Sequence, residues 1–210
     1  LDISDVISNG TSILHHFSFQ DPYLWRDQQK NTDLLDQKTS YSNLSVIPRD
    51  ALEFLDQEIG RAIQLRNGQK VPILIIECKN SEGLIHYLDA IAKQIPNQRS
   101  DHFFVEQYKQ HIIRKLPVKN LPVLLFGDIA KDLPEGYYSS FENYVLMSPN
   151  LPVLKEFLSD ILNENTWGKT LSEKKFLKKI NKASPHTIIV NGAESWDHLY
   201  PAMQPKWQNN

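Results

Sequence analysis

Glu77 and Lys79 are the residues whose types and spacing best fit a chemical role. They directly follow the apolar segment 71–76 (VPILII), which is typical of a strand buried on both faces. Alternate side chains of a strand point to the same side, so residues 77 and 79 are expected to lie together where this strand ends. A carboxylate can hold Mg²⁺, and a nearby cation can position or activate the attacking water. The pair is therefore compatible with metal-dependent hydrolysis.

An apolar strand that ends in Glu-x-Lys resembles the catalytic strand of the PD-(D/E)xK nuclease superfamily. Glu77-Cys78-Lys79 supplies this pattern here. The resemblance implies a Mg²⁺-dependent nuclease in which Glu77 is a metal ligand and Glu77 and Lys79 are catalytic.

A nuclease of this type also needs a second acid on a neighbouring strand. Asp56 and Glu58 are the nearest candidates, but both lie in a segment whose apolar spacing predicts a helix. The alternative is a hairpin in which residues 63–66 pair with residues 71–75 through Asn67-Gly68, a typical turn sequence. The segment 56–70 therefore decides between the two interpretations of Glu77.

The order of the predicted elements between residues 48 and 162 resembles the central part of an AAA+ or RecA-like core. In this interpretation Glu77 takes the acidic Walker B position, and Asp128 lies near the end of the sensor strand. The chain contains no G-x-x-x-x-G-K-[ST] motif to bind phosphates, so ATP hydrolysis is not expected. The resemblance implies a non-catalytic protein-interaction or regulatory module without a cofactor.

A third interpretation gives Glu77 and Lys79 no chemical role. They are then solvated residues where a strand leaves the core, and Cys78 is a small buried hydrophobic residue. The sequence leaves the three interpretations open. The interaction module is our first prediction for the function, and the nuclease is the alternative.

Apolar periodicity predicts an alternation of helices and strands. The predicted helices cover residues 50–66, 82–95, 101–116 and 153–162, and the predicted strands cover residues 71–76, 121–126, 143–147 and 186–190. Strands separated by helices favour parallel pairing with helices on both faces. The predicted fold class is α/β, a three-layer sandwich with a mainly parallel central sheet.

The predicted organisation has three parts. Residues 1–47 form a lightly structured N-terminal extension with one candidate strand near residues 12–19. Residues 48–163 form the α/β core. Residues 164–210 contain a Lys-rich helix, a strand and a tail rich in Trp and Pro.

The C-terminal part carries the residues that we predict to bind a partner. A helix over residues 172–183 concentrates positive charge, and the tail that follows is rich in large aromatic side chains. We expect a protein partner, and the Lys-rich helix also permits a nucleic acid partner through its charge. The predicted partner-binding residues are Lys174, Lys175, Lys178, Lys179, Trp196 and Trp207.

Two further pairs of residues attract attention because of their types. His15 and His16 are adjacent, so in a strand they point to opposite faces and do not chelate one ion. Asp197 and His198 have the types of an acid and a base of a hydrolase, but no G-x-S-x-G nucleophile motif accompanies them. We expect structural roles for both pairs.

Composition gives weak limits on the compartment. A single cysteine, Cys78, favours an intracellular protein, whereas the glycosylation sequons at Asn9 and Asn43 permit a luminal one.

No segment reaches the roughly 18 apolar residues of a membrane span. The formal net charge of −2 gives no global attraction to nucleic acid. The chain begins with Leu1, so we expect an excised domain or a processed product.

Overall fold

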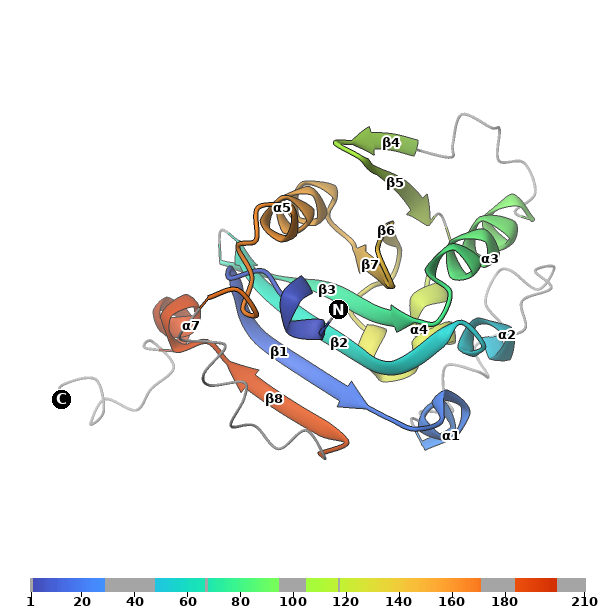
Figure 1. The fold of residues 1–210 in the computed structure, drawn as a ribbon, viewed down its shortest axis with the longest axis horizontal. Helices are drawn as coiled ribbons and strands as arrows, with labels where there is room; N and C mark the ends of the chain where they lie inside the picture. The colour runs from blue at the N-terminus through green and yellow to red at the C-terminus, as the bar shows by residue number, and fades with distance from the viewer. Residues whose placement is uncertain are drawn as a thin grey trace.

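The computed structural model describes residues 2–28, 48–66, 68–94, 105–116, 118–170 and 184–199. Within these ranges the chain forms one eight-stranded sheet in the order β4-β5-β6-β7-β3-β2-β1-β8 (Figure 1). The strands are β1 (Thr11–Ser18), β2 (Leu55–Arg66), β3 (Gln69–Cys78), β4 (Val105–Tyr108), β5 (His111–Leu116), β6 (Gly136–Phe141), β7 (Tyr144–Ser148) and β8 (His186–Val190). Every pairing is antiparallel, so the predicted fold class, an α/β sandwich with a mainly parallel sheet, is wrong.

Three of the seven antiparallel pairings are tight hairpins. Strands joined by a two-residue turn must run in opposite directions. The β2–β3 turn lies between Arg66 and Gln69 and contains Gly68 with a φ of +77°. The β4–β5 and β6–β7 turns contain Lys109 and Glu142, both with positive φ values. Parallel pairing would instead need a long crossover between neighbouring strands.

The segment predicted as a helix over residues 50–66 contains the largest local difference. Helix α2 (Pro48–Leu52) ends early, and β2 occupies the rest of the segment. The pairing of β2 with β3 shifts register between Leu55 and Ile59. The hairpin at residues 67–68, which the sequence offered as the alternative, is the observed structure.

Two other predicted elements have the wrong type. Residues 101–116 were predicted as a helix, but Val105–Tyr108 and His111–Leu116 form a hairpin. Residues 121–126 were predicted as a strand, but they form the short helix α4 (Leu121–Phe126), followed by the 3₁₀ helix η4 (Gly127–Ala130). The predicted strand at 121–126 therefore contributes nothing to the sheet.

The other predicted elements are confirmed. The structure contains β3, α3 (Ser81–Lys93), β7, α5 (Leu151–Leu162) and β8 close to the predicted positions. Ile73, Leu74 and Ile75 of β3 are fully buried, as expected for a strand in the middle of a sheet. The long apolar run therefore identified the central strand correctly, although its neighbours run in the other direction.

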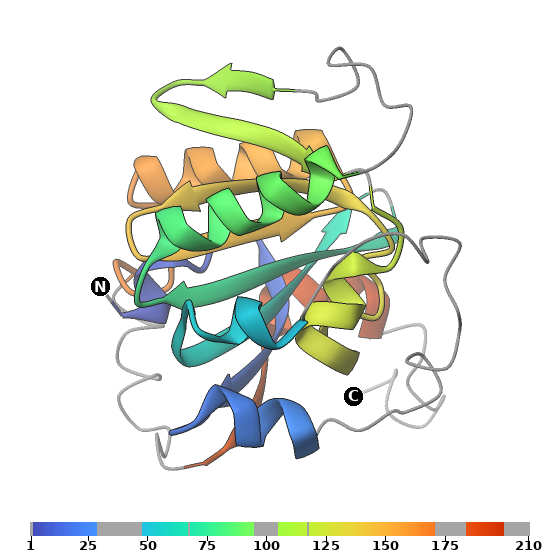
Figure 2. The same cartoon turned by 90° about the vertical axis from the view of Figure 1, so that its right-hand side faces the viewer.

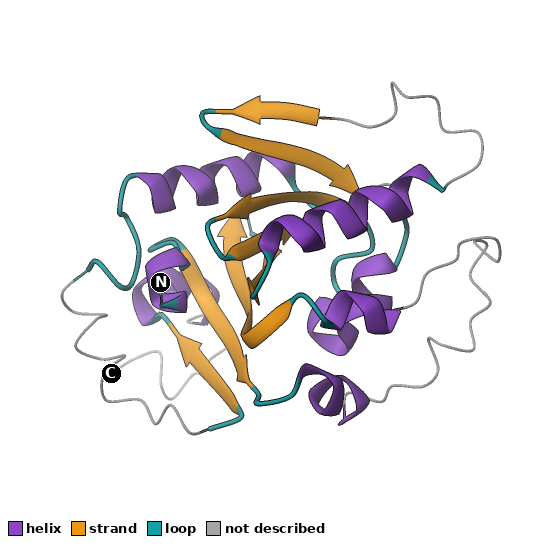
Figure 3. Cartoon of the chain, turned by 45° about the vertical axis from the view of Figure 1, so that its right-hand side comes forward, coloured by secondary structure: helices purple, strands orange, loops and turns teal. Residues whose placement is uncertain are grey.

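Helices lie on both faces of the sheet (Figure 3). On the first face, α1 (Pro22–Gln28), α2, α3 and α4 contribute to a core with the side chains of Ile59, Leu74 and Ile76. On the second face, α5 and the 3₁₀ helix η1 (Ile3–Val6) pack with side chains such as Ile73 and Ile75. Neighbouring residues of β3 thus alternate between two separate apolar cores.

Strands from the beginning and the end of the chain lie side by side in this sheet. β1 pairs with β2 on one side and with β8 on the other. Helix α7 (Gly192–Leu199) follows β8 directly and contacts β1. The β4–β5 hairpin lies at the opposite end of the sheet (Figure 2). None of the described helices is long and apolar enough to cross a membrane.

Candidate functional site

Glu77 lies near the end of β3, in a half-buried position opposite Tyr144 of β7. Its carboxylate accepts a hydrogen bond of 3.3 Å from the backbone N–H of Gln57 in β2. Burial raises the pKa of Glu77, and the charges of Glu58 and Asp56 act in the same direction, while the hydrogen bond from Gln57 opposes them. The β2–β3 hairpin therefore brings both candidate second acids into electrostatic reach of Glu77.

These acids do not assemble into a metal centre. The Glu58 carboxylate lies 2.7 Å from Nε2 of His16 in β1, so it already has a partner. Within the described ranges, no group of three or more His, Cys, Asp or Glu side chains is arranged to hold a metal ion. The described residues therefore do not fit the Mg²⁺ site that the nuclease resemblance implies.

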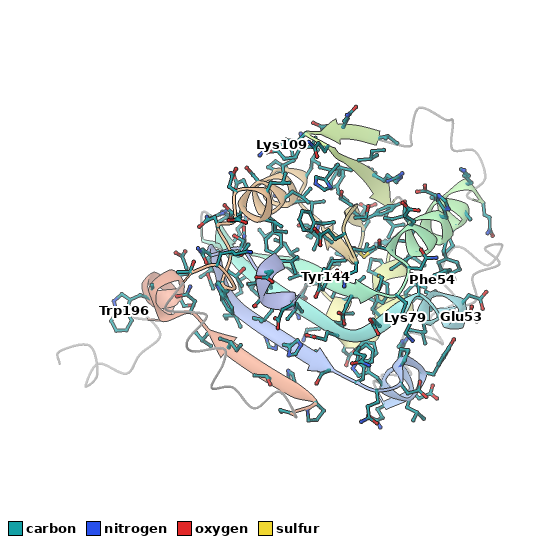
Figure 4. The ribbon with its side chains drawn as sticks, viewed as in Figure 1. Glu53, Phe54, Lys79, Lys109, Tyr144 and Trp196 are labelled. Carbon is teal, nitrogen blue, oxygen red and sulfur yellow. The ribbon has the colours of Figure 1, made fainter. Side chains whose placement is uncertain are left out.

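Lys79 and Cys78 lie beside Glu77 but do not extend the site. Lys79 is exposed, and its backbone N–H donates to the carbonyl of Phe54 (Figure 4). In this part of the chain, no salt bridge joins Lys79 to Glu77. The Cys78 thiol is buried, which raises its pKa to about 12, so it is not a thiolate nucleophile at neutral pH.

Most of the predicted partner-binding residues lie outside the described residues. These are Lys174, Lys175, Lys178, Lys179 and Trp207. Trp196 is described: its side chain is 53 % exposed on α7 and points away from the sheet (Figure 4). The side chains of Asp197 and His198 are not among those described.

The histidine pair behaves as alternation requires. His15 faces the side of the sheet on which α4 lies, whereas His16 contacts Glu58 on the other side.

The sequon at Asn9 is also in a defined environment. The Asn9 Nδ2 group, which a glycan would modify, donates to Asn165 at 2.7 Å and to Thr170 at 2.8 Å. Asn43 lies outside the described residues.

A groove of about 700 Å³ lies on the first face of the sheet, over β1, β2 and the start of β3. We call it the basic groove. Its walls come from three strands, from the turn after η4 and from the turn before α5. The lining residues are Ile13, His15, Arg61, Ile63, Gln69, Lys70, Val71, Pro72, Lys131, Asp132, Pro149 and Asn150.

Strand register explains why these side chains share one face. Directly opposed residues of neighbouring antiparallel strands point to the same side of a sheet. One such row contains Ile188 of β8, His15 of β1, Arg61 of β2 and Leu74 of β3. Leu74 is fully buried in the first core, whereas Ile188 is 55 % exposed. The row thus passes from the core to an open surface, and His15 and Arg61 lie at the transition.

Positive charge dominates the basic groove. Arg61, Lys70 and Lys131 carry positive charge there, and Asp132 is the one carboxylate of the lining. Arg61 pairs with Asp132, and the Arg61 side chain is 13 % exposed. Burial lowers the pKa of His15, and the positive charges of Arg61 and Lys131 and the nearby His186 lower it further. The groove is therefore suited to an anionic ligand.

The open surface beside the groove is apolar. The next row along the strands contains Val190, Ile13, Ile63 and Pro72. Val190 is 50 % exposed, and Ile13 is half-buried. We call Ile13, Ile188 and Val190 the open face. The open face and the basic groove share Ile13, so they form one continuous surface.

Sequence reasoning missed this surface because it assigned the wrong element to residues 55–66. In a strand, Ile59, Arg61 and Ile63 alternate with Gly60 and Ala62, so an arginine lies between two aliphatic residues on one face. In a helix these residues would be spread around the axis. The alternation was present in the sequence, but the apolar spacing of the same segment also matched a helical period.

Comparison of the chain with protein-family models, with curated proteins and with solved structures finds no match. The resemblances to AAA+ or RecA-like cores and to PD-(D/E)xK nucleases therefore have no support from relatives.

Proposed function

We propose that the protein is a non-catalytic protein-interaction module whose partner packs on the open face. The observation that carries this proposal is the exposure of Ile188 and Val190, two aliphatic side chains that lie beside each other on the same side of an edge strand. Monomeric proteins rarely expose continuous apolar surface without a functional reason. An edge strand with such side chains is also prone to pair with another chain.

The polar surroundings support a specific partner over unspecific association. The open face borders the basic groove, which offers charged groups at its rim. Interfaces commonly combine an apolar centre with a polar rim. A partner that covers Ile188 and Val190 would reach Arg61 and His15 within the same row of side chains.

Site-specific crosslinking tests this proposal. A photo-reactive amino acid at Ile188 reports on the open face, and the same group at Val105 is the matched control, because Val105 is 59 % exposed on the opposite edge strand. We expect one crosslinked protein from position 188 that is absent from position 105. The purified protein should then bind the chain directly, and Ile188→Asp should weaken its binding about tenfold or more.

The control variant Val105→Asp should change the affinity by less than about twofold, because surface changes outside an interface contribute little. Equal crosslinking from both positions would refute the proposal. So would direct binding that Ile188→Asp leaves unchanged.

The nuclease alternative has one observation in its favour. The hairpin places Asp56 and Glu58 close enough to raise the pKa of Glu77 further. A second cavity, of about 660 Å³, borders Glu58, but its lining includes Asp21 and contains neither Lys nor Arg. Such a cavity would repel the phosphates of a nucleic acid. The nuclease interpretation, with Mg²⁺ as its cofactor, therefore stays a prediction that the variant Glu77→Gln tests.

A further inference from the structure

We infer that the basic groove binds an acidic, extended segment of a partner polypeptide. This inference rests on the proposed function, because it names the part of the partner that would extend from the open face into the groove. Three properties of the surface carry it: the charge of the groove, its apolar floor and its continuity with the edge of the sheet.

The charge of the groove differs from that of the whole chain. The chain has a formal net charge of −2, yet three cationic side chains line the groove against the single carboxylate of Asp132. Lys70 and Lys131 are exposed, and neither forms a salt bridge with another described residue. Unpaired lysines at the rim of a groove attract carboxylates and increase the rate of association.

Arg61 is the fixed cation of the groove. Its guanidinium group donates to Asp132, and the two residues come from β2 and from the turn after η4. The buried Arg61 Nε has no hydrogen-bond partner among the described residues. A buried donor without a partner is costly. Arg61 therefore has hydrogen-bonding capacity that Asp132 does not use, and its position is set from two sides of the groove.

The apolar floor distinguishes a polypeptide from a simple inorganic anion. Ile13, Ile63 and Pro72 line the groove together with the cationic side chains. A phosphate or sulfate ion would leave this floor uncovered. An extended peptide presents alternate side chains to one surface, so aliphatic and acidic residues at those positions can cover the floor and reach the lysines together.

Because the open face and the basic groove are continuous, the partner segment can run from the open face into the groove. Ile13 belongs both to the groove and to the open face, where Val190 and Ile188 lie on the edge strand. The groove volume of about 700 Å³ is within the usual range for ligand clefts. A segment that starts on the open face can therefore continue into the groove without leaving the sheet.

Fluorescence anisotropy with synthetic peptides tests the inference on the full chain. The probe is a labelled peptide of about eight residues, roughly 26 Å long when extended, with Glu and Ile on one face and Ser and Thr on the other. The matched control peptide carries Lys in place of Glu. We expect the Glu peptide to bind about tenfold or more tightly than the Lys peptide, and its binding to weaken as salt is added.

Charge reversal in the protein locates the binding. The double variant Lys70→Glu/Lys131→Glu should weaken binding of the Glu peptide about tenfold or more. The matched control Lys93→Glu/Lys109→Glu reverses two exposed lysines on α3 and on the β4–β5 turn and should change binding by less than about twofold. Circular dichroism of each variant checks that it is folded.

Several outcomes would overturn the inference. Equal affinity for the Glu and Lys peptides would exclude charge recognition, and an equal effect of the two double variants would exclude this groove. Competition by inorganic pyrophosphate at the same concentration as the peptide would indicate a small-anion site instead. A concentration-dependent dimer that Ile188→Asp dissociates would make a second copy of the chain the occupant. The wild-type chain could also fail to bind the Glu peptide and still crosslink to a partner from position 188. That result would refute the inference but not the proposed function.

Discussion

The ionisation of His15 should affect stability near neutral pH. Its folded-state pKa is lowered, first by burial and then by Arg61, His186 and Lys131, which face it from β2, β8 and the turn after η4. Lys70 and Asp132 are the other charged residues of the same groove. Because the unfolded chain binds this proton more readily, the free energy of unfolding falls as the pH decreases below the ordinary histidine value near 6.5.

The variant His15→Gln should therefore lose less stability than the wild type between about pH 7.5 and about pH 5.5, where an ordinary histidine titrates. Urea denaturation of both proteins at the two pH values measures this difference. An identical loss in both proteins would show that the proton binds His15 equally in the folded and unfolded chains.

Glu77→Gln separates the two functional interpretations at the level of one residue. The amide keeps the shape of the side chain and removes the charge that Mg²⁺ needs. We expect no cleavage of single- or double-stranded DNA or RNA by the wild type with Mg²⁺ or Mn²⁺. Metal-dependent cleavage that disappears in Glu77→Gln would instead establish the nuclease. Cleavage that survives the substitution would indicate a contaminant.

The apolar run 121–126 shows what the sequence could and could not reveal at the scale of an element. A short continuous apolar segment fits a buried strand or a buried helix equally well. Pro122 in the first turn and Gly127 at the end, with a φ of +76°, are the local signals that favour the observed helix α4. Leu125 and Phe126 are fully buried, whereas Leu124 is only half-buried, contrary to what a central strand at 121–126 would require.

Because residues 121–126 form a helix, the adjacent Leu124 and Leu125 are buried to different extents, which mutation can measure. Leu125 is fully buried, whereas Leu124 is half-buried against the first core. Leu125→Ala should lower the free energy of unfolding by about 2–5 kcal/mol, which is usual for a buried leucine. Leu124→Ala should cost clearly less. Chemical denaturation measures both, and equal losses would contradict the partial exposure of Leu124.

Gly136 marks the point where β6 begins beside the end of β7. A Cβ atom at this position would lie 2.4 Å from the backbone oxygen of Ser148, which cannot move without shifting the strand. Gly136→Ala should lower the free energy of unfolding by about 1–3 kcal/mol, as overpacking typically does. Gly192→Ala is the control, because nothing lies within 4 Å of its Cβ position. Thermal unfolding compares the two variants.

At the scale of the whole molecule, the sequence predicted the central strand but not the direction of its neighbours. The run 71–76 identifies β3 because both of its faces are buried. The direction of three pairings depends on hairpin turns, and two of these turns contain Lys109 and Glu142 at positive φ in place of the usual glycine. The candidate surface could not be predicted, because it requires β8, β1 and β2 to be neighbours although they are distant in the chain.

The pairing of β1 with β8 links residues near the two ends of the described chain. Contacts between residues so far apart in sequence slow folding, because a long loop must close before they form. β8 is also made after every other strand of the sheet during synthesis. Until it docks, β1 is itself an edge strand and the open face lacks Ile188 and Val190. Under the proposed function, a chain that ends before residue 186 would lack Ile188 and Val190 and could not bind the partner.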